Sequence, residues 1–279
     1  NLNQAISDAN SAKSTPNYKE ADPDKQKALD GALSAAKTAK TSNDPSAVEK
    51  ATTDLKAAQS GLNGDSNLAT AKEQADQNIA KLTNLSDGQK DIAKQNISNA
   101  QTTSDVQQAE QTAKTLNDDL GNLNQAISDA NSAKSTPNYT EADSGKQTAL
   151  DDALSEAEKA KNSNDPSAVA TATTDLQAAQ SGLNGDSNLA KTKQQAEQNL
   201  EQMTNLSADQ KKAANDKITS ANTSSDVTKA ENDAQTLNDN LGELNKAIAA
   251  ANSAKSTPNY KEADSGKQTA LDDALSEAE

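Results

Sequence analysis

The stretch VQQAEQTAKTLNDDLGNLNQAISDANSAK, from Val106 to Lys134, decides the fold of this chain. Its apolar residues recur every three or four positions without losing phase: Val106, Ala109, Ala113, Leu116, Leu120, Leu123, Ile127 and Ala130. This spacing places one apolar stripe along an α-helix. We therefore predict one continuous helix from about Asp105 to Lys134, although Gly121 lies in its middle.

The same stretch crosses the boundary of an internal repeat. NLNQAISDANSAKSTPNY occurs at Asn1–Tyr18 and again, unchanged, at Asn122–Tyr139, and a near copy occurs at Glu243–Tyr260. The period is 121 residues without insertion, which is longer than most solenoid repeats and indicates one or two small domains per copy. Because Asn1 already lies inside a repeat, we expect the chain to be a segment of a longer protein.

Composition leaves two classes of protein open. Hydrophobic residues make up 32% of the 279 residues, and the formal net charge is -15. These values fit either a disordered chain or thin helical bundles with cores of Ala and Leu, and the periodic apolar spacing favours the bundles. The acidic charge argues against nucleic acid as a partner. No apolar run approaches the roughly 20 residues of a membrane span.

Capping residues mark where the helices of each copy begin. In the first copy we predict a loop at Ser14–Tyr18. The pairs Asp22-Pro23 and Asp44-Pro45 each read as an N-cap followed by proline at the first helical position. Ser86 and Gln89 form the capping-box pattern S-x-x-Q. These patterns predict helix starts near Pro23, Pro45 and Asp87.

Glycines and polar residues mark the remaining boundaries. Gly61 and Gly64 are predicted to end one helix, and Asp65 or Ser66 to cap the next. Ser104 is predicted to start the last helix, so each copy holds six helices. A chain that passes through three antiparallel helices leaves a bundle at the end opposite its entry. The predicted fold is therefore all-α: tandem three-helix bundles joined end to end by shared long helices into an elongated rod.

Two phrases carry a resemblance to a known family. GLNGDSNLATAKEQAD at Gly61–Asp76 and LTNLSDGQKDIAKQNISNAQTTSDVQQA at Leu82–Ala109 resemble the giant staphylococcal extracellular-matrix-binding proteins. The second copy carries GLNGDSNLAKTKQQAE and MTNLSADQKKAANDKITSANTSSDV at matching positions. In that family each repeat pairs a FIVAR module with a GA-like module, both three-helix bundles, and the resemblance covers the whole chain.

The resemblance implies a domain organisation and a cellular location. It places FIVAR-like modules at 1–64 and 122–185, GA-like modules at 65–121 and 186–242, and a truncated FIVAR-like module of two helices at 243–279. It implies an extracellular, wall-anchored surface protein of a Gram-positive bacterium that binds host matrix such as fibronectin. Albumin-binding GA modules carry Tyr and other bulky residues around the second helix. That helix has no aromatic residue here, so the resemblance favours fibronectin over albumin as a ligand.

Five residues are candidates for a functional role. Tyr18, Tyr139 and Tyr260 are the only aromatic residues and are candidate ligand contacts, since Tyr is frequent at interfaces. The interpretation that we favour is that each ring covers the end of a bundle. Gly121 and Gly242 lie within the predicted shared helices. They are either inter-module hinges or places where another segment approaches closely.

No catalytic, cofactor or metal site is predicted. Acidic clusters such as Asp22–Asp24 and Asn117–Asp119 lack the spacing of a Ca²⁺-binding loop and fit helix caps and solvated faces better. The chain has no His and no Cys, which removes the commonest general base and the strongest nucleophile. We therefore expect a protein that is not an enzyme and needs no cofactor.

Three functions remain open at this point. The first is a non-catalytic stalk or spacer of a Gram-positive cell-surface adhesin. The second is a multivalent array whose modules each bind a host matrix or serum protein weakly, with avidity multiplying the effect. The third is a disordered acidic spacer. We expect a monomer, and we expect residues 243–279 to be less ordered than the rest, apart from the helix continuing from Val227.

Overall fold

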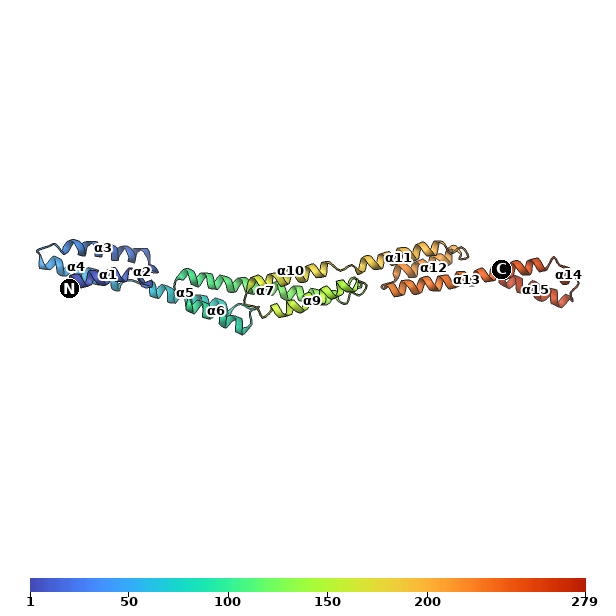
Figure 1. The fold of residues 1–279 in the computed structure, drawn as a ribbon, viewed down its shortest axis with the longest axis horizontal. Helices are drawn as coiled ribbons and strands as arrows, with labels where there is room; N and C mark the ends of the chain where they lie inside the picture. Colours follow the sequence, from blue (N-terminus) through green and yellow to red (C-terminus); the bar gives the residue numbers. More distant parts are fainter. The chain divides into compact units, whose positions relative to one another are not determined.

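The computed structural model describes all residues from Asn1 to Glu279, and they form helices and short connections without a strand (Figure 1). The helices are α1 Leu2–Ala12, α2 Pro16–Lys19, α3 Pro23–Ala39, α4 Pro45–Ser60, α5 Gly64–Ala80, α6 Asp87–Asn99, α7 Thr103–Ala133, α8 Pro137–Thr140, α9 Ser144–Ala160, α10 Pro166–Ser181, α11 Gly185–Glu201, α12 Ala208–Ser220, α13 Ser224–Ala254, α14 Pro258–Lys261 and α15 Ser265–Ala278. The chain divides into two compact units. Unit 1 comprises Asn1–Ser128 and Ala153–Leu176, and unit 2 comprises Asp129–Asp152 and Gln177–Glu279.

Unit 1 begins with a three-helix bundle of α1, α3 and α4, which lie side by side (Figure 1). Its core consists of small and medium apolar side chains: Leu2, Ala5, Ala9, Leu29, Leu33, Ala36, Ala51 and Leu55. Leu29 and Leu55 are 0% exposed. Complete burial of a Leu side chain contributes about 1.5–3 kcal/mol, whereas Ala contributes little. A core of this composition gives a thin bundle that depends on a few Leu side chains.

A second group of helices in unit 1 consists of α5, α6 and the first part of α7. Helix α5 packs against α6, and its residue Asn78 donates a hydrogen bond from Nδ2 to Glu110 Oε1 on α7 at 2.9 Å. Ile79, Ile97 and Val106 supply buried apolar side chains from the three helices. The predicted capping box at the start of α6 is confirmed: Ser86 Oγ accepts from Gln89 N, and Gln89 Oε1 accepts from Ser86 N.

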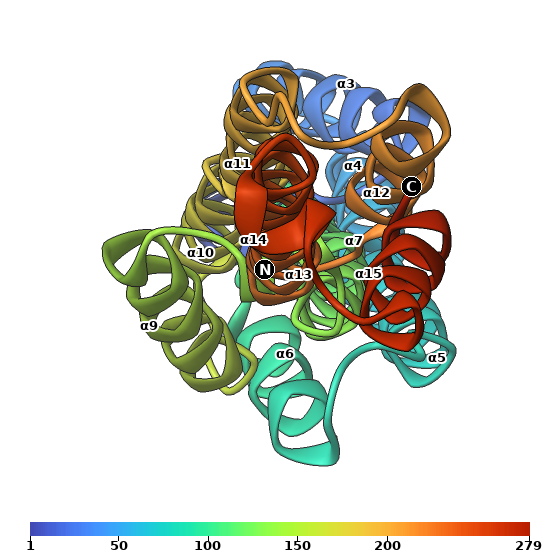
Figure 2. The ribbon, with the colours of Figure 1, turned by 90° about the vertical axis from the view of Figure 1, so that its right-hand side faces the viewer.

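Unit 2 contains the equivalent bundle of α11, α12 and α13, whose core includes Ala196, Leu200, Met203, Ile218 and Val227. Helix α13 continues beyond this bundle and packs against α15, to which the single-turn helix α14 connects it (Figures 1 and 2).

The predicted shared helices are confirmed. α7 and α13 are each continuous over 31 residues and pass through Gly121 and Gly242 without a break. The apolar stripe predicted for the first of them is buried along its length, including Val106, Leu116 and Leu123. Both glycines have ordinary negative φ angles, so neither interrupts the helical geometry.

Three predicted helix boundaries were wrong. The Ser14–Tyr18 segment is not only a loop, because Pro16–Lys19 form the single turn α2, so each full copy has seven helical segments. Extended Thr15 and the proline ring at the first helical position favour this turn. Asn63, rather than Asp65 or Ser66, is the N-cap of α5, so Gly64 begins this helix instead of ending the one before it. The last helix of the copy begins at Thr103, one residue before the predicted start.

None of the helices combines the length and the apolar character that crossing a bilayer requires.

Candidate functional site

The three tyrosines lie in three copies of one polar cluster, which we call the tyrosine cluster. In the first copy, Tyr18 Oη donates to Asp30 Oδ2 at 2.9 Å, and Lys13 Nζ forms an ion pair with Asp30 Oδ1 at 2.8 Å. Lys13 Nζ also lies 5.5 Å from the centre of the Tyr18 ring, within the range of a cation–π contact. Gln26 Nε2 donates to the backbone oxygen of Tyr18, which fixes α2 against the start of α3.

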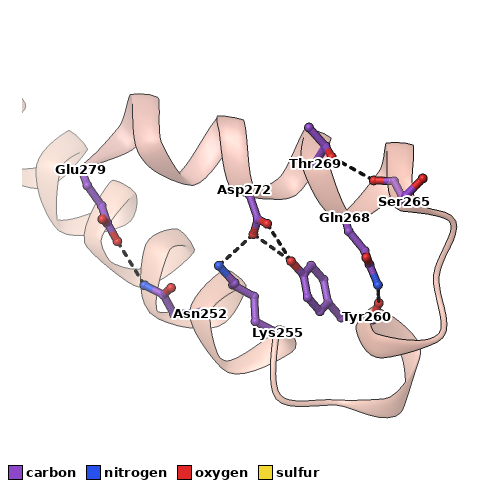
Figure 3. A network of polar contacts seen from close by, with 8 residues as sticks. All are labelled: Asn252, Lys255, Tyr260, Ser265, Gln268, Thr269, Asp272 and Glu279. Atoms are coloured by element: carbon purple, nitrogen blue, oxygen red, sulfur yellow. Dashed lines mark hydrogen bonds and ion pairs between the residues drawn. The ribbon is translucent and has the colours of Figure 1, made fainter.

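The same cluster occurs twice more along the chain. Tyr139 Oη donates to Asp151 Oδ2, which pairs through Oδ1 with Lys134, at 2.9 and 2.8 Å. Figure 3 shows the third copy, in which Tyr260 and Lys255 both reach Asp272. The sequence spacing is the same each time: each aspartate follows its tyrosine by 12 residues. Each lysine lies at the end of the first helix of its repeat, and each aspartate lies inside the next long helix.

Charge and hydrogen bonding shift the pKa values within the cluster in opposite directions. The Lys13 ammonium and then the Tyr18 hydroxyl hold the pKa of Asp30 below its usual value. The same carboxylate raises the pKa of Tyr18 and the pKa of Lys13. All three groups are solvent-accessible, so these shifts describe a mutually satisfied surface network rather than a reactive centre.

A second group of polar contacts, which we call the asparagine joint, connects the first bundle of unit 1 to the second. Asn63 Nδ2 donates to Asp22 Oδ2 at 2.8 Å, and Asn63 Oδ1 accepts from Asp22 N at 3.0 Å. Asn67 Nδ2 donates to Asp22 Oδ1 and to the backbone oxygen of Glu20, both at 3.0 Å. These bonds lower the pKa of the Asp22 carboxyl, with the bond from Asn63 as the largest cause. Asp22 is the N-cap residue of α3, as predicted. Its side chain makes no capping hydrogen bond and instead accepts hydrogen bonds from Asn63 and Asn67.

Backbone atoms approach closely at the centre of this joint. A Cβ atom at Gly64 would lie 2.3 Å from the backbone oxygen of Asn17 and 2.8 Å from Ala21 N. Only glycine therefore fits at this position, for a steric reason rather than for a positive φ. The side chain of Asn17 completes the contact, because its Oδ1 accepts from Asp65 N at 3.0 Å and so caps α5 from outside the helix.

The joint also reaches the start of the shared helix α7. Glu20 Oε2 accepts from the backbone nitrogen and the hydroxyl of Thr103, at 2.9 and 2.7 Å. A carboxylate at the N-terminus of a helix satisfies its free N–H groups and is favoured by the helix dipole. The connection after α2 therefore contacts both α5 and α7, which are two of the three helices of the following bundle.

Unit 2 repeats the asparagine joint with the same geometry. Asn184 Nδ2 donates to Asp143 Oδ2 at 2.8 Å, and Asp186 N donates to Asn138 Oδ1 at 3.1 Å. A Cβ atom at Gly185 would lie 2.5 Å from the backbone oxygen of Asn138. The remaining members of this joint are Glu141, Asn188 and Ser224.

The sequence does not predict the asparagine joint. At Gly121 and Gly242 it leaves the close approach of another segment as one of two alternatives. Asn84 Nδ2 donates to the backbone oxygen of Asn117, and a Cβ atom at Gly121 would lie 2.8 Å from this nitrogen. Asn205, Asn238 and Gly242 repeat the contact. A close approach therefore occurs at both glycines, whereas their role as hinges stays a prediction. The signal that could have revealed the joint is the identical phrase GLNGDSN in both copies.

One further contact in unit 1 joins α6 to the connection before α10. The Gln89 side chain, which is 5% exposed, donates from Nε2 to the backbone oxygens of Ser163 at 2.7 Å and Lys161 at 3.1 Å. The acidic side chains of the chain form no group of three or more that could hold a metal ion. The polar chemistry of the molecule is thus concentrated in contacts between its own segments.

Comparison with protein families separates the chain into two kinds of module. The FIVAR domain model matches residues 1–63, 119–184 and 240–279. The GA module model matches residues 65–119 and 186–240.

Relatives of known name match over the whole chain. The extracellular matrix-binding protein EbhA of Staphylococcus aureus strain Mu3 is 35% identical over 289 aligned residues, and the extracellular matrix-binding protein ebh of strain MRSA252 is also 35% identical. Each alignment covers 100% of this chain, but the chain spans only 4% and 3% of the two relatives. A crystallised EbhA domain from Staphylococcus aureus matches 84% of this chain and 98% of its own length, with a TM-score of 0.78 and 29% identity.

Proposed function

Because the chain belongs to the Ebh family of extracellular matrix-binding proteins, built from FIVAR and GA modules, we propose that it is a stalk segment of a bacterial cell-surface adhesin. We assign FIVAR modules to 1–64 and 122–185, GA modules to 65–121 and 186–242, and an incomplete FIVAR module to 243–279. The relatives are matrix-binding proteins rather than enzymes, and the proposed role is non-catalytic and extracellular.

The observation that carries this proposal is that consecutive modules are fastened in two ways. The asparagine joint fixes each FIVAR module to the following GA module through contacts to both α5 and α7, as with Asn63 and Thr103. The GA module then passes into the next FIVAR module through a continuous 31-residue helix, which is about 45 Å long at ~1.5 Å per residue. Neither connection resembles the flexible, Gly- and Ser-rich linker of independent domains.

The direction of extension follows from the number of helices in each module. Three antiparallel helices bring the chain in at one end of a bundle and out at the other. Modules fastened in this way add length with each repeat, as in other linear repeat proteins whose units contact only their neighbours. In our proposal, the tyrosine cluster holds the turn of each FIVAR module, and Asn84 and Asn205 fix the shared helices at Gly121 and Gly242 instead of leaving them as hinges.

Small-angle scattering of the whole chain tests this proposal. An extended stalk gives a pair-distance distribution with a long tail and a cross-section of one bundle. The double variant Gly64→Ala/Gly185→Ala, which disturbs both joints, should broaden that distribution. Gly31→Ala, where a Cβ atom meets nothing within 4 Å, is the matched control and should leave it unchanged. A compact particle, or a joint variant that scatters like the control, would contradict the stalk.

A second function, a multivalent array for host matrix, has support from the names of the relatives, which describe matrix-binding proteins. Fibronectin is the ligand that the sequence resemblance suggests. The exposed large apolar side chains do not recur between copies: Ile92 is replaced by Ala213 in the second copy, and the equivalents of exposed Leu237 and Leu244, Leu116 and Leu2, are buried. Binding of fibronectin to one 121-residue copy and to two separates the functions. An array gains affinity steeply with copy number, whereas a stalk shows no specific binding.

A further inference from the structure

We propose that Asn63-Gly64 and Asn184-Gly185 are sites of spontaneous deamidation, which the closed asparagine joint suppresses and an opened joint permits. Each event would prevent that joint from closing again. These are the only two Asn-Gly pairs in the chain, and both lie at the centre of a joint. The inference rests on the joint geometry and does not depend on whether the chain acts as a stalk.

The joint explains why this dipeptide occurs here. Position 64 must be glycine because a Cβ atom there would lie 2.3 Å from the Asn17 oxygen. Position 63 needs a donor and an acceptor on one short side chain, because Asn63 donates to Asp22 Oδ2 and accepts from Asp22 N. Aspartate lacks the donor and alanine lacks both. The fold therefore favours Asn before an obligatory Gly, although this is the dipeptide in which the following residue hinders succinimide formation least.

The chemistry needs only water as a co-reactant. The backbone nitrogen of Gly64 attacks the side-chain carbonyl carbon of Asn63. A new C–N bond closes a five-membered succinimide, the bond from that carbon to Nδ2 breaks, and the nitrogen leaves as ammonia after proton transfer from the backbone amide. Water then opens the ring at either carbonyl, which yields aspartate or isoaspartate at position 63. No oxidant, reductant or metal takes part.

The closed joint holds the reacting atoms apart. Asn63 has φ -128° and ψ 16°, and its side-chain amide is fixed by the two bonds to Asp22. Gly64 is buried and is the first residue of α5. Attack requires rotation of the Asn63 side chain and of the peptide that follows it, which breaks both bonds and moves the first turn of α5. We therefore expect the reaction to proceed only after the joint has opened.

Deamidation would make the opening permanent. A carboxylate at position 63 would place an anionic oxygen where Nδ2 now lies, 2.8 Å from Asp22 Oδ2. Two carboxylates at that distance repel each other, and the donor is lost. Isoaspartate would also add a methylene group to the backbone beside Gly64, which has no free space on the side of Asn17. Asn184 faces Asp143 in the same way in unit 2.

Peptide mapping by mass spectrometry in ¹⁸O-labelled water tests the suppression. The whole chain is incubated at mildly alkaline pH, folded in one sample and unfolded in urea in the other. We expect Asn63 and Asn184 to incorporate ¹⁸O at least tenfold more slowly in the folded sample, and to be the fastest sites in the unfolded one. Equal rates in the two samples would overturn the claim that the joint shields these residues.

The consequence for the joint is tested with the variant Asn63→Asp, read by hydrogen exchange of the Asp65 amide, which donates to Asn17 Oδ1 in the closed joint. Asn232→Asp, an exposed position on α13, is the charge-matched control. We expect at least tenfold faster exchange at Asp65 in the first variant and no change in the control. Because the second copy keeps its own joint, unit 2 provides an internal reference for folding. Unchanged protection of Asp65 in Asn63→Asp would contradict the proposed loss of the joint.

Discussion

The side-chain amide of Asn84 lies in the space that the missing side chain of Gly121 leaves open. Asn84 Nδ2 donates to the backbone oxygen of Asn117 at 2.9 Å, and a Cβ atom at Gly121 would lie 2.8 Å from that nitrogen. Asn84 N also donates to Asn117 Oδ1 at 2.9 Å. The connection after α5 is thereby fastened to the middle of the shared helix α7.

This contact predicts a thermodynamic coupling between Asn84 and Gly121. Gly121→Ala gains about 1 kcal/mol of helix propensity but displaces the Asn84 amide, whose hydrogen bonds contribute a similar amount. The free energy of unfolding of the single variant should therefore lie within about 0.5 kcal/mol of the wild-type value. In an Asn84→Ala background the same substitution should stabilise by about 1 kcal/mol. Urea denaturation of the four proteins measures the coupling.

Gly31 supplies the control for this experiment. It lies within α3, and a Cβ atom there would meet nothing within 4 Å. Gly31→Ala should stabilise by about 0.5–1 kcal/mol in either background. Additive effects of Gly121→Ala and Asn84→Ala would show that the two residues do not interact.

Gly64→Ala should open the asparagine joint of the first copy. The added Cβ meets backbone atoms of Asn17 and Ala21, which cannot rotate away as a side chain does. Overpacking of this kind costs about 1–3 kcal/mol. We expect lower resistance to urea together with faster amide exchange at Asp65. If exchange at Asp65 stays at the wild-type rate, the steric argument is wrong.

Removing the hydroxyl groups of the tyrosine cluster should lower stability slightly and should leave ligand binding unchanged. Replacing Tyr18, Tyr139 and Tyr260 by Phe keeps each ring and removes each bond to an aspartate. We expect Tm to fall by no more than about 3 °C, since exposed polar contacts contribute little. Fibronectin binding of the triple variant should equal that of the wild type. A marked loss of binding would favour the tyrosines as ligand contacts.

Stability should depend on pH only at the extremes. The folded pKa of Asp30 is lowered, so its contribution is present above the unfolded value near ~4 and is lost as pH falls through the folded value. The folded pKa values of Tyr18 and Lys13 are raised. Their contributions are complete below the unfolded values near ~10 and are lost as pH rises through the folded values.

The chain has no His, so no side chain of ordinary pKa titrates between these two limits. We expect Tm to be level between about pH 5 and pH 9 and to fall on both sides. Circular dichroism melts across the pH range measure this. A slope near pH 6 or 7 would require a titrating group that the described clusters do not contain.

Residues 243–279 should exchange their amides faster than the equivalent residues of the first copy. Leu244 is 39% exposed, whereas its equivalents Leu2 and Leu123 are 8% and 0% exposed. In the first bundle, α4 covers this face, and no such helix packs on α13 and α15. Protection at Leu244 equal to that at Leu2 would contradict the expectation, while the start of α13 at Val227 should remain protected.

Local patterns were sufficient to predict most helices, and they failed where a distant segment takes over a local role. The stripe from Val106 to Ala130 predicted α7, and the S-x-x-Q pattern predicted the start of α6. Asp65 and Ser66 looked like caps, yet α5 already begins at Gly64 after the N-cap Asn63, and Asn17 supplies a capping oxygen from outside the helix. The sequence of the α5 start contains no sign of that oxygen.

The amino-acid sequence is enough to determine the repeat period, the helical class and the continuity of the shared helices. The helices could be predicted because they depend on spacings of three or four residues within one segment. Tertiary structure alone decided which polar side chains fasten one module to the next. Asn63 meets Asp22 from 41 residues away, and Glu20 meets Thr103 from 83 residues away. Hydrogen bonds act over about 3 Å, so these pairs exist only once folded bundles bring the segments together.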